Sequence, residues 1–212
     1  MPTKLNTNET MPSNRRKILE YGSVSLATLY SGCLSSNFLS DSNGTGRQEI
    51  KFESEVSNQA SEESPAVVSL KIINQSSNKV EIEPTGQGAA PLEYIEPLSG
   101  AQGEIFFYPQ SNNRVDIRNG EFSHNGCWKV IDGSEGEAYL SRVSQSVPIS
   151  LEPESIYSIE HEVYYHGPEN VCFPEGEYEG EVSITVMTND QRTDIPHEYS
   201  VTISEGGDIR IS

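Results

Sequence analysis

Apolar and polar side chains alternate along four stretches of the chain, in residues 68–72, 80–83, 182–186 and 199–203. Successive side chains of a strand point to opposite faces, so this alternation is typical of sheets with one buried and one solvated face. Clusters of Asn, Gly and Pro separate the stretches, as turns require, and we find no helical stripe beyond the first 32 residues. The pattern therefore predicts an all-β fold, an antiparallel β-sandwich over residues 49–212 that is immunoglobulin-like in the loose sense.

The N-terminal residues carry a different pattern and are set apart from the fold. Arg15 and Arg16 precede a mildly apolar stretch, residues 18–30, which is shorter than the roughly 20 residues of a spanning helix. The stretch ends in Gly32-Cys33. This order resembles a twin-arginine export signal followed by a lipobox. The resemblance implies a signal peptide over residues 1–32, an export signal at the two arginines, and a lipid on Cys33.

Two residues depart from that pattern. Tyr30 stands where a lipobox normally has an aliphatic residue, and Glu20 interrupts the apolar stretch early. A plain cleaved signal, an uncleaved anchor and a disordered Ser/Asn-rich tail therefore stay open as alternatives. Residues 33–48 are rich in Ser, Gly and Asn without apolar periodicity, which predicts a flexible tether.

Two sequons for N-glycosylation occur downstream of the apolar stretch. Asn43-Gly44-Thr45 lies in the predicted tether, and Asn74-Gln75-Ser76 lies at a predicted turn. Such short patterns also arise by chance. Asn43 and Asn74 are therefore candidate glycosylation sites.

The chain is strongly acidic, with 32 Asp plus Glu against 14 Lys plus Arg and a formal net charge of -18. Without residues 1–32, 30 acidic and 10 basic residues remain, so the predicted exported part is more acidic than the whole. Electrostatic binding of nucleic acid requires a basic surface and is excluded. High Glu, few Lys and the twin-arginine leader together resemble exported proteins of halophilic archaea. An acidic surface protein from a low-salt organism is the alternative.

Three cysteines are present, and Cys127 and Cys172 remain once Cys33 is assigned to lipid. An even pair in an exported domain is most simply a disulfide. A reactive thiol or a metal-binding pair is the alternative.

Three segments carry a resemblance to a family. Gly126-Cys127-Trp128, the stretch 151–154 and the Cys-Phe-Pro-Glu-Gly-Glu-Tyr of residues 172–178 together resemble uncharacterised haloarchaeal lipoproteins. A fainter similarity, through residues 70–76, is to β-sandwich proteinase-inhibitor domains. Neither resemblance implies a catalytic residue.

Metal and catalytic chemistry find little support in the sequence. His161 and His166 are five residues apart in a predicted strand, which places them on opposite faces and argues against a zinc site. His124 and His197 read as turn or surface residues. The acidic loop 132–137 could wrap Ca²⁺, but an acidic hairpin turn is the simpler interpretation. We expect no metal, no cofactor and no enzymatic activity, because nothing places a nucleophile beside a base.

The sequence thus predicts a lipid-anchored β-sandwich protein with a binding or structural role at the outer face of the cell membrane. Its expected partners are the membrane, through the lipid on Cys33, and an unknown surface protein or glycan. An extracellular proteinase inhibitor is the alternative function. Interfaces favour tyrosine, and five tyrosines are candidates for contact area, namely Tyr94, Tyr108, Tyr157, Tyr164 and Tyr165.

Overall fold

A computed structural model describes residues 50–212, except 86–88, 111–113, 125–126, 169 and 189–190. The chain divides into two units, residues 1–32 and 33–212, and every described residue belongs to the second. The predicted export signal at Arg15 and Arg16, the lipid site Cys33, the tether and the sequon at Asn43 lie outside the described residues. None of the described residues forms a helix long and apolar enough to cross a membrane.

The described part of the chain is all-β, as predicted. Its strands in chain order are β1 (Ile50–Asn58), β2 (Ala66–Asn74), β3 (Val80–Pro84), β4 (Leu98–Gly100), β5 (Gly103–Pro109), β6 (Val115–Arg118), β7 (Gly120–His124), β8 (Trp128–Asp132), β9 (Tyr139–Arg142), β10 (Ile149–Leu151), β11 (Ile156–His166), β12 (Gly176–Thr188), β13 (Gln191–Ile203) and β14 (Ile209–Ile211).

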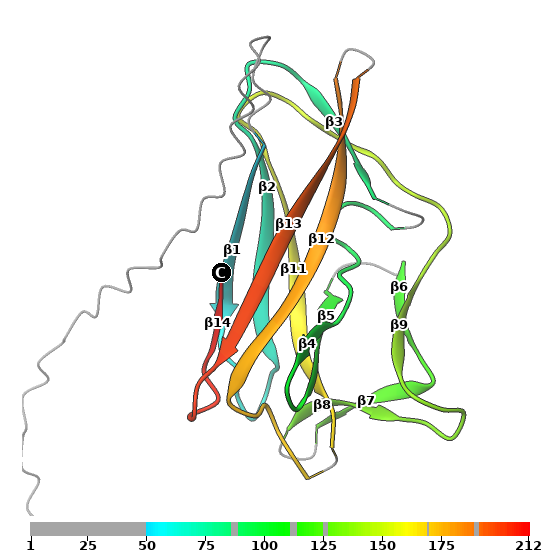
Figure 1. The fold of residues 1–212 in the computed structure, drawn as a ribbon, viewed down its shortest axis with the longest axis vertical. Coiled ribbons are helices and arrows are strands. Elements are labelled where there is room, and N and C mark those ends of the chain that lie inside the picture. The colour runs from blue at the N-terminus through cyan, green and yellow to red at the C-terminus, as the bar shows by residue number, and fades with distance from the viewer. Residues whose placement is uncertain (1–49, 86–88, 111–113, 125–126, 169, 189–190) are drawn as a thin grey trace, which may run out of the picture. The chain divides into compact units, whose positions relative to one another are not determined.

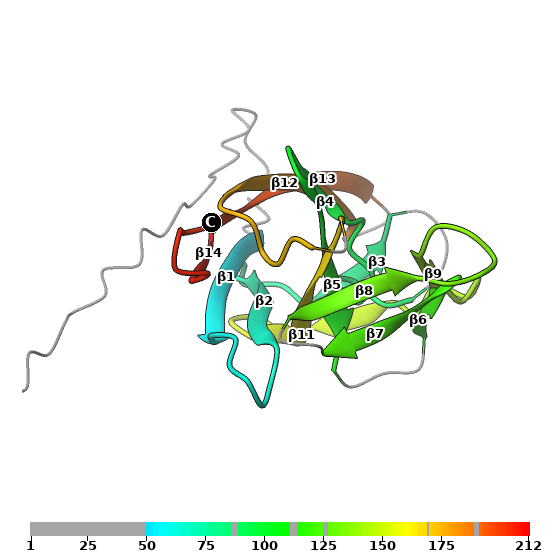
Figure 2. The same ribbon diagram turned by 90° about the horizontal axis from the view of Figure 1, so that it is seen from below.

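The strands form two facing layers. One layer runs β1–β2–β11–β5, and the other contains β3, β12, β13 and β14. β4 pairs with both β5 and β12, so it joins the two layers along one side. Figure 1 shows the long β12–β13 pair crossing in front of β2 and β11, and Figure 2 shows the two layers from below. The predicted β-sandwich is confirmed.

The main core lies between these layers and is built from the alternating residues. Val68, Leu70 and Ile72 of β2 are fully buried, and they face Ile184 and Val186 of β12 within one apolar cluster. The intervening Ser and Lys side chains of β2 point to the opposite face of the sheet. Period-two alternation therefore identified the correct core face of each of these strands.

A third, smaller layer covers part of the outer face of β5 and β11. It consists of the antiparallel pairs β7–β8 and β6–β9. A second apolar cluster fills the space beneath it, with Phe106 of β5 and Tyr164 of β11 packed among Val115, Val130 and Leu140. β8 joins the main sheet by pairing parallel with the end of β11. Among the described strand pairs the antiparallel expectation holds except here, and one isolated bridge, between Ala89 and Ser146, is also parallel.

The loop that follows β11 is fastened to the third layer. Cys127 and Cys172 form a disulfide with their Cα atoms 5.7 Å apart, so the predicted pairing is confirmed. Lys129 is buried, and its Nζ donates to the carbonyl oxygens of Pro168 (2.7 Å) and Val171 (2.9 Å). A covalent link and a charged hydrogen-bonding group, two residues apart in the chain, thus hold the same loop.

Candidate binding surface

The outer face of β11 carries polar and aromatic side chains at alternate positions. Glu160, Glu162 and Tyr164 point to this face, because His161 and Val163 between them belong to the buried interior. In the register of the neighbouring strand, Glu162 lies opposite Tyr108 of β5. The β11–β5 pair therefore brings carboxylates and phenol rings together on one surface.

Four aromatic side chains gather there, which we call the aromatic ledge: Tyr108, Phe122, Trp128 and Tyr164. The ring centroid of Phe122 lies 4.7 Å from that of Tyr108 and 4.3 Å from that of Tyr164. Trp128 stands edge-on to Tyr164 at 6.4 Å. These separations are typical of packed aromatic pairs. β5, β7, β8 and β11 each supply one ring.

The ledge is open to solvent along part of its length. Tyr164 is buried, Tyr108 and Trp128 are half-buried, and Phe122 keeps 36% of its surface exposed. The indole Nε1 of Trp128 donates to the carbonyl oxygen of Ser61 (2.8 Å), in the connection between β1 and β2. Contiguous apolar patches rimmed by polar residues mark interaction sites, whereas scattered single residues do not, and the exposed Phe122 ring is continuous with the half-buried rings of Tyr108 and Trp128.

Carboxylates make the ledge electrostatically negative. The hydroxyl of Tyr164 donates to Oε2 of Glu162 (2.6 Å). Burial raises the pKa of Tyr164, and the adjacent Glu162 raises it further. Burial also raises the pKa of Tyr108, with Asp116 and Glu162 adding to the effect. Both phenols are therefore protonated at neutral pH, and the carboxylate of Glu162 acts only as an acceptor.

Basic side chains are unevenly distributed over this face. On β1 and β2, Lys51 pairs with Glu53 (2.7 Å) and Lys71 pairs with Glu55 (2.6 Å). Glu162, by contrast, has no described Lys, Arg or His side chain within 4.0 Å. Among the described residues, Asp116 beside Tyr108 is paired with Arg118 (3.3 Å), whereas Glu162 is in no salt bridge.

A separate recess of about 120 Å³ lies beside β12, between the residues that pair with β4 and those that pair with β3. Arg142 places its guanidinium carbon 4.2 Å from the centroid of the Tyr94 ring. The Tyr94 hydroxyl donates to Oε2 of Glu96 (3.0 Å). Burial, aided by Glu96 and opposed by Arg142, raises the pKa of Tyr94 to about 12. The remaining lining residues are Pro84, Thr85, Ala90, Leu92, Glu181, Val182 and Ser183.

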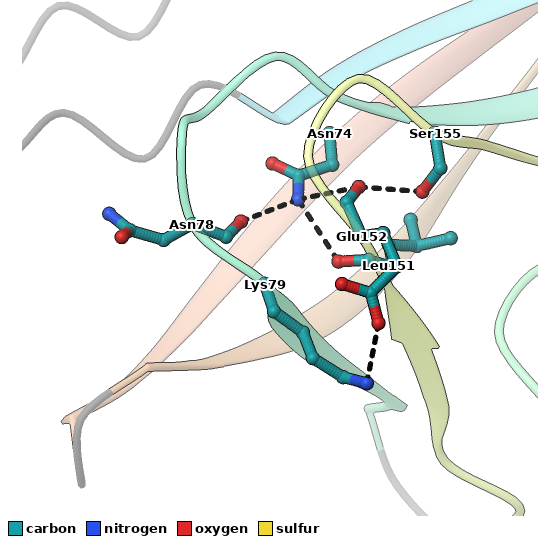
Figure 3. Close-up of polar contacts among 6 residues, drawn as sticks. All are labelled: Asn74, Asn78, Lys79, Leu151, Glu152 and Ser155. Carbon is teal, nitrogen blue, oxygen red and sulfur yellow. Dashed lines mark hydrogen bonds and ion pairs between the residues drawn. The ribbon is translucent and has the colours of Figure 1, made fainter.

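The candidate glycosylation residue Asn74 is fully buried. Its Nδ2 lies within hydrogen-bonding distance of the carbonyl oxygens of Asn78 (2.8 Å), Leu151 (3.1 Å) and Glu152 (3.1 Å), as Figure 3 shows. Its Oδ1 accepts hydrogen bonds from the backbone N–H and the hydroxyl of Ser76. These hydrogen bonds, which we call the Asn74 bracket, fix the β2–β3 turn to residues 151–152. A glycan on Nδ2 of Asn74 would disrupt them.

The predicted separation of His161 and His166 is confirmed. His161 is fully buried in the interior, and burial lowers its pKa to about 4, although the backbone of Leu92 and Glu93 opposes the shift. Neither of its ring nitrogens forms a hydrogen bond of normal geometry. His166 lies on the opposite face, where its Nε2 is 2.9 Å from Oδ1 of Asp132. The two imidazoles share no site.

The acidic loop 132–137 is anchored by hydrogen bonds at Asp132. Oδ1 of Asp132 accepts from the backbone N–H of Ala138 (2.8 Å) and also contacts His166. The Ala138 bond, followed by the His166 bond, lowers the pKa of Asp132. The described residues contain no group of three His, Cys, Asp or Glu side chains that could hold a metal ion. The loop thus has the form of an acidic turn closed by its own hydrogen bonds.

The candidate tyrosines divide by environment. Tyr108 and Tyr164 belong to the ledge and Tyr94 to the recess, whereas Tyr165 is buried in the main core. Tyr157 is half-buried, and burial raises its pKa to about 12, with the nearby charge of Glu93 adding to the effect. Phe122 carries no local signal in the sequence that marks it as part of a site. Its position between Tyr108 of β5 and Tyr164 of β11 follows only from the three-dimensional pairing of the strands.

His197 also differs from the sequence-based expectation of a turn or surface position. It lies within β13, half-buried, with its ring stacked on Phe52 of β1 at 4.3 Å and edge-on to Tyr199 at 4.5 Å. The reason is that β1 and β13 approach one another at the open side of the sandwich. This approach is a tertiary contact that no local pattern encodes.

Comparison with known proteins gives little further information. No protein-family model matches the chain, and no curated protein matches it. Among solved structures, the chain is similar to the CssB subunit, complemented with a donor strand from the CssA subunit, of the enterotoxigenic Escherichia coli colonization factor CS6. The similarity covers 72% of this chain and 97% of that chain at 16% identity, with a TM-score of 0.39. A likeness of this size gives no basis for assigning a function.

Proposed function

We propose that this chain is a binding protein displayed at the outer face of the cell membrane and that the aromatic ledge is its binding surface. The observation that carries the proposal is the setting of Phe122. Its ring is 36% exposed between Tyr108 and Tyr164, next to the carboxylate of Glu162. Aromatic side chains are enriched in protein interfaces, because a rigid ring buries a large area at little entropic cost.

The membrane attachment in this proposal is supported by the leader. Arg15 and Arg16, the apolar stretch and Cys33 occur in the order of a lipoprotein export signal. A lipid on Cys33 and a flexible tether over residues 33–48 would hold the sandwich away from the membrane with its ledge accessible. Mass spectrometry of the membrane fraction tests this part of the proposal: a mature chain that begins after Cys33 and carries no lipid would refute it.

Capture of a partner from native envelopes at high salt tests the binding role. The full chain is compared with Phe122→Ser, which removes the exposed ring, and with Ile156→Ser as a matched control. Ile156 is 58% exposed and lies on the same strand face at the far end of β11 from Glu162. We expect Phe122→Ser to reduce capture by about tenfold or more, because truncation of a central interface residue commonly has this effect. Equal capture of a partner by the Phe122→Ser and Ile156→Ser variants would show that the aromatic ledge is not the binding surface.

The alternative function, proteinase inhibition, gains no support from the described residues. Residues 70–76, which carry the resemblance, comprise the end of β2 and the turn after it. β2 is paired on both sides, by β1 and by β11, and the turn is fixed through the buried Asn74. An inhibitory segment must be exposed to enter a protease cleft, and this one is part of the scaffold.

A further inference from the structure

We infer that the aromatic ledge binds arginine side chains in a basic segment of a partner protein. This inference rests on the proposed binding role and names the chemistry of the partner. It is carried by three observations: the exposed ring of Phe122, a carboxylate beside it with no described basic side chain within 4.0 Å, and a tyrosine–glutamate pair elsewhere in the fold that already holds an arginine.

The internal example is the Tyr94 site. There a tyrosine donates to a glutamate two residues away, Tyr94 to Glu96, and the guanidinium of Arg142 lies over the ring at 4.2 Å. A cation above an aromatic face is attracted by the negative charge of the ring face, and a neighbouring carboxylate strengthens the attraction. The fold therefore shows that this arrangement of tyrosine and glutamate accommodates an arginine.

The ledge contains the same tyrosine–glutamate pair, but the ring that packs on Tyr164, at 4.3 Å, is the exposed Phe122 rather than a guanidinium. Tyr164 donates to Glu162, again two residues away, at 2.6 Å. Glu162 also lies opposite Tyr108 in the β-ladder, and Phe122 lies between the two tyrosine rings. No described basic side chain lies within 4.0 Å of Glu162. A partner's guanidinium could stack on the exposed Phe122 ring and donate hydrogen bonds to this carboxylate.

Charge and solvent both favour arginine over other ligands. The chain has a formal net charge of -18, and anionic partners would be repelled by the carboxylates around the ledge. A guanidinium is planar and weakly hydrated, so it stacks on aromatic rings and pairs with carboxylates better than an ammonium does. Such short-range contacts also survive in concentrated salt, where the Debye length is about 3 Å at 1 M and distant charges no longer attract.

The chain contains its own reporter for this test. Trp128 is the single tryptophan, and it packs against Tyr164 within the ledge. The full chain in detergent is titrated with three peptides of the form acetyl-Gly-Xaa-Gly-Xaa-Gly-amide, in which Xaa is arginine, lysine or citrulline. Citrulline has nearly the shape of arginine but no charge. Tryptophan fluorescence is followed in dilute and in molar KCl.

We expect a saturable response to the arginine peptide, binding about tenfold weaker for the lysine peptide, and no response to the citrulline peptide. Phe122→Ser and Glu162→Gln should each abolish or weaken the arginine response, and Ile156→Ser should leave it unchanged. Citrulline binding as tight as arginine binding, or a full arginine response in Glu162→Gln, overturns the inference. Absence of any saturable response to the arginine peptide overturns it as well.

The envelope experiment separates this inference from the proposed function. If Phe122→Ser loses a captured partner while the arginine peptide does not bind, the ledge is a binding surface with another ligand, such as a neutral glycan. If Phe122→Ser captures as much as the unaltered chain, the proposed function itself fails. A captured partner whose contact segment lacks arginine would also contradict the inference and leave the binding role intact.

Discussion

The side-chain amide of Gln59 forms with Ile209 the two hydrogen bonds that a strand residue forms with its neighbour. Its Nε2 donates to the Ile209 carbonyl oxygen (2.8 Å), and its Oε1 accepts from the Ile209 N–H (2.9 Å). β1 and β14 are the terminal strands of the main sheet order, and neither pairs with the other. Gln59 therefore links the two layers at the side of the sandwich that β4 leaves open.

We call this pair of hydrogen bonds the Gln59 clasp. Removal of the clasp should destabilise the domain without altering its core. We expect Gln59→Ala to lower the free energy of unfolding by about 1–2 kcal/mol, because both backbone groups of Ile209 lose a partner at a half-buried position. Denaturant unfolding followed by circular dichroism measures the change. Gln145→Ala is the control, since Gln145 is exposed and its side chain forms no described hydrogen bond. An equal effect of the two variants would show that the clasp contributes nothing.

Substitution of Asn74 should lower the free energy of unfolding by more than substitution of Gln59 does. Asn74→Asp replaces a donor with a carboxylate that faces the carbonyl oxygens of Leu151 and Glu152 in a buried position. We expect a loss of about 3–5 kcal/mol, since an uncompensated buried charge is strongly destabilising. Asn78→Ala is the matched control, because only the backbone of Asn78 contributes to the bracket. Comparable stability of the two variants would contradict this role.

Reduction of the Cys127–Cys172 disulfide should lower stability substantially. The bridge closes a loop with a sequence separation of 45 residues. The chain-entropy model assigns such a loop about 4 kcal/mol. The double variant Cys127→Ser/Cys172→Ser should unfold at correspondingly lower denaturant concentration and show no further change on addition of reductant. If it unfolds at the same concentration as the oxidised chain, Lys129 and the surrounding packing suffice to hold the loop.

Two histidines, the fully buried His161 and the half-buried His197, should make the fold acid-sensitive below neutral pH. Burial lowers the pKa of His161 and of His197 to about 4, below the ordinary value of 6.5. The unfolded chain therefore binds protons first, so the stability contributed by the neutral imidazoles is complete above about pH 6.5 and is lost as the pH falls toward about 4. For His161 the loss is on the order of 3 kcal/mol.

Unfolding free energies measured between pH 7 and pH 4 check this expectation. His161→Leu and His197→Phe replace each imidazole with a side chain that does not titrate, and the second keeps a ring stacked on Phe52. Both variants should lose less stability over this range than the unaltered chain. Parallel curves for all three proteins would show that other groups cause the acid sensitivity. Asp132, whose pKa is lowered, would contribute only at still lower pH, below about 4.

Stability should also rise with salt. The net charge of -18 produces self-repulsion in the compact state. Screening at molar KCl removes most of this repulsion. We expect the midpoint of thermal unfolding to increase from dilute to molar KCl. A midpoint that falls over this range would count against an origin in concentrated salt.

The sequence predicted the features that depend on local pattern. Alternation located β2, β3, β12 and β13 and identified their core faces, and the cysteine count identified the disulfide. The ledge could not be predicted, because Phe122 of β7 meets Tyr108 of β5 only through the parallel pairing of β8 with β11. The sequon at Asn74 does lie at an exposed turn, but the burial of the Asn74 and Ser76 side chains within it depends on contacts with residues 151–152 that no local pattern encodes. Period-two alternation specifies which face is buried, not which strands become neighbours.

The entry of the chain into the domain at β1 has a mechanical consequence. Any tension along the residues before Ile50 is applied to a terminal strand whose one described strand partner is β2. The resistance to pulling is then provided by the β1–β2 ladder, the stack of Phe52 on His197 and the Gln59 clasp. A domain held by its N-terminus while it binds a partner would therefore yield first at this strand, and the aromatic ledge on β5, β7, β8 and β11 would stay intact.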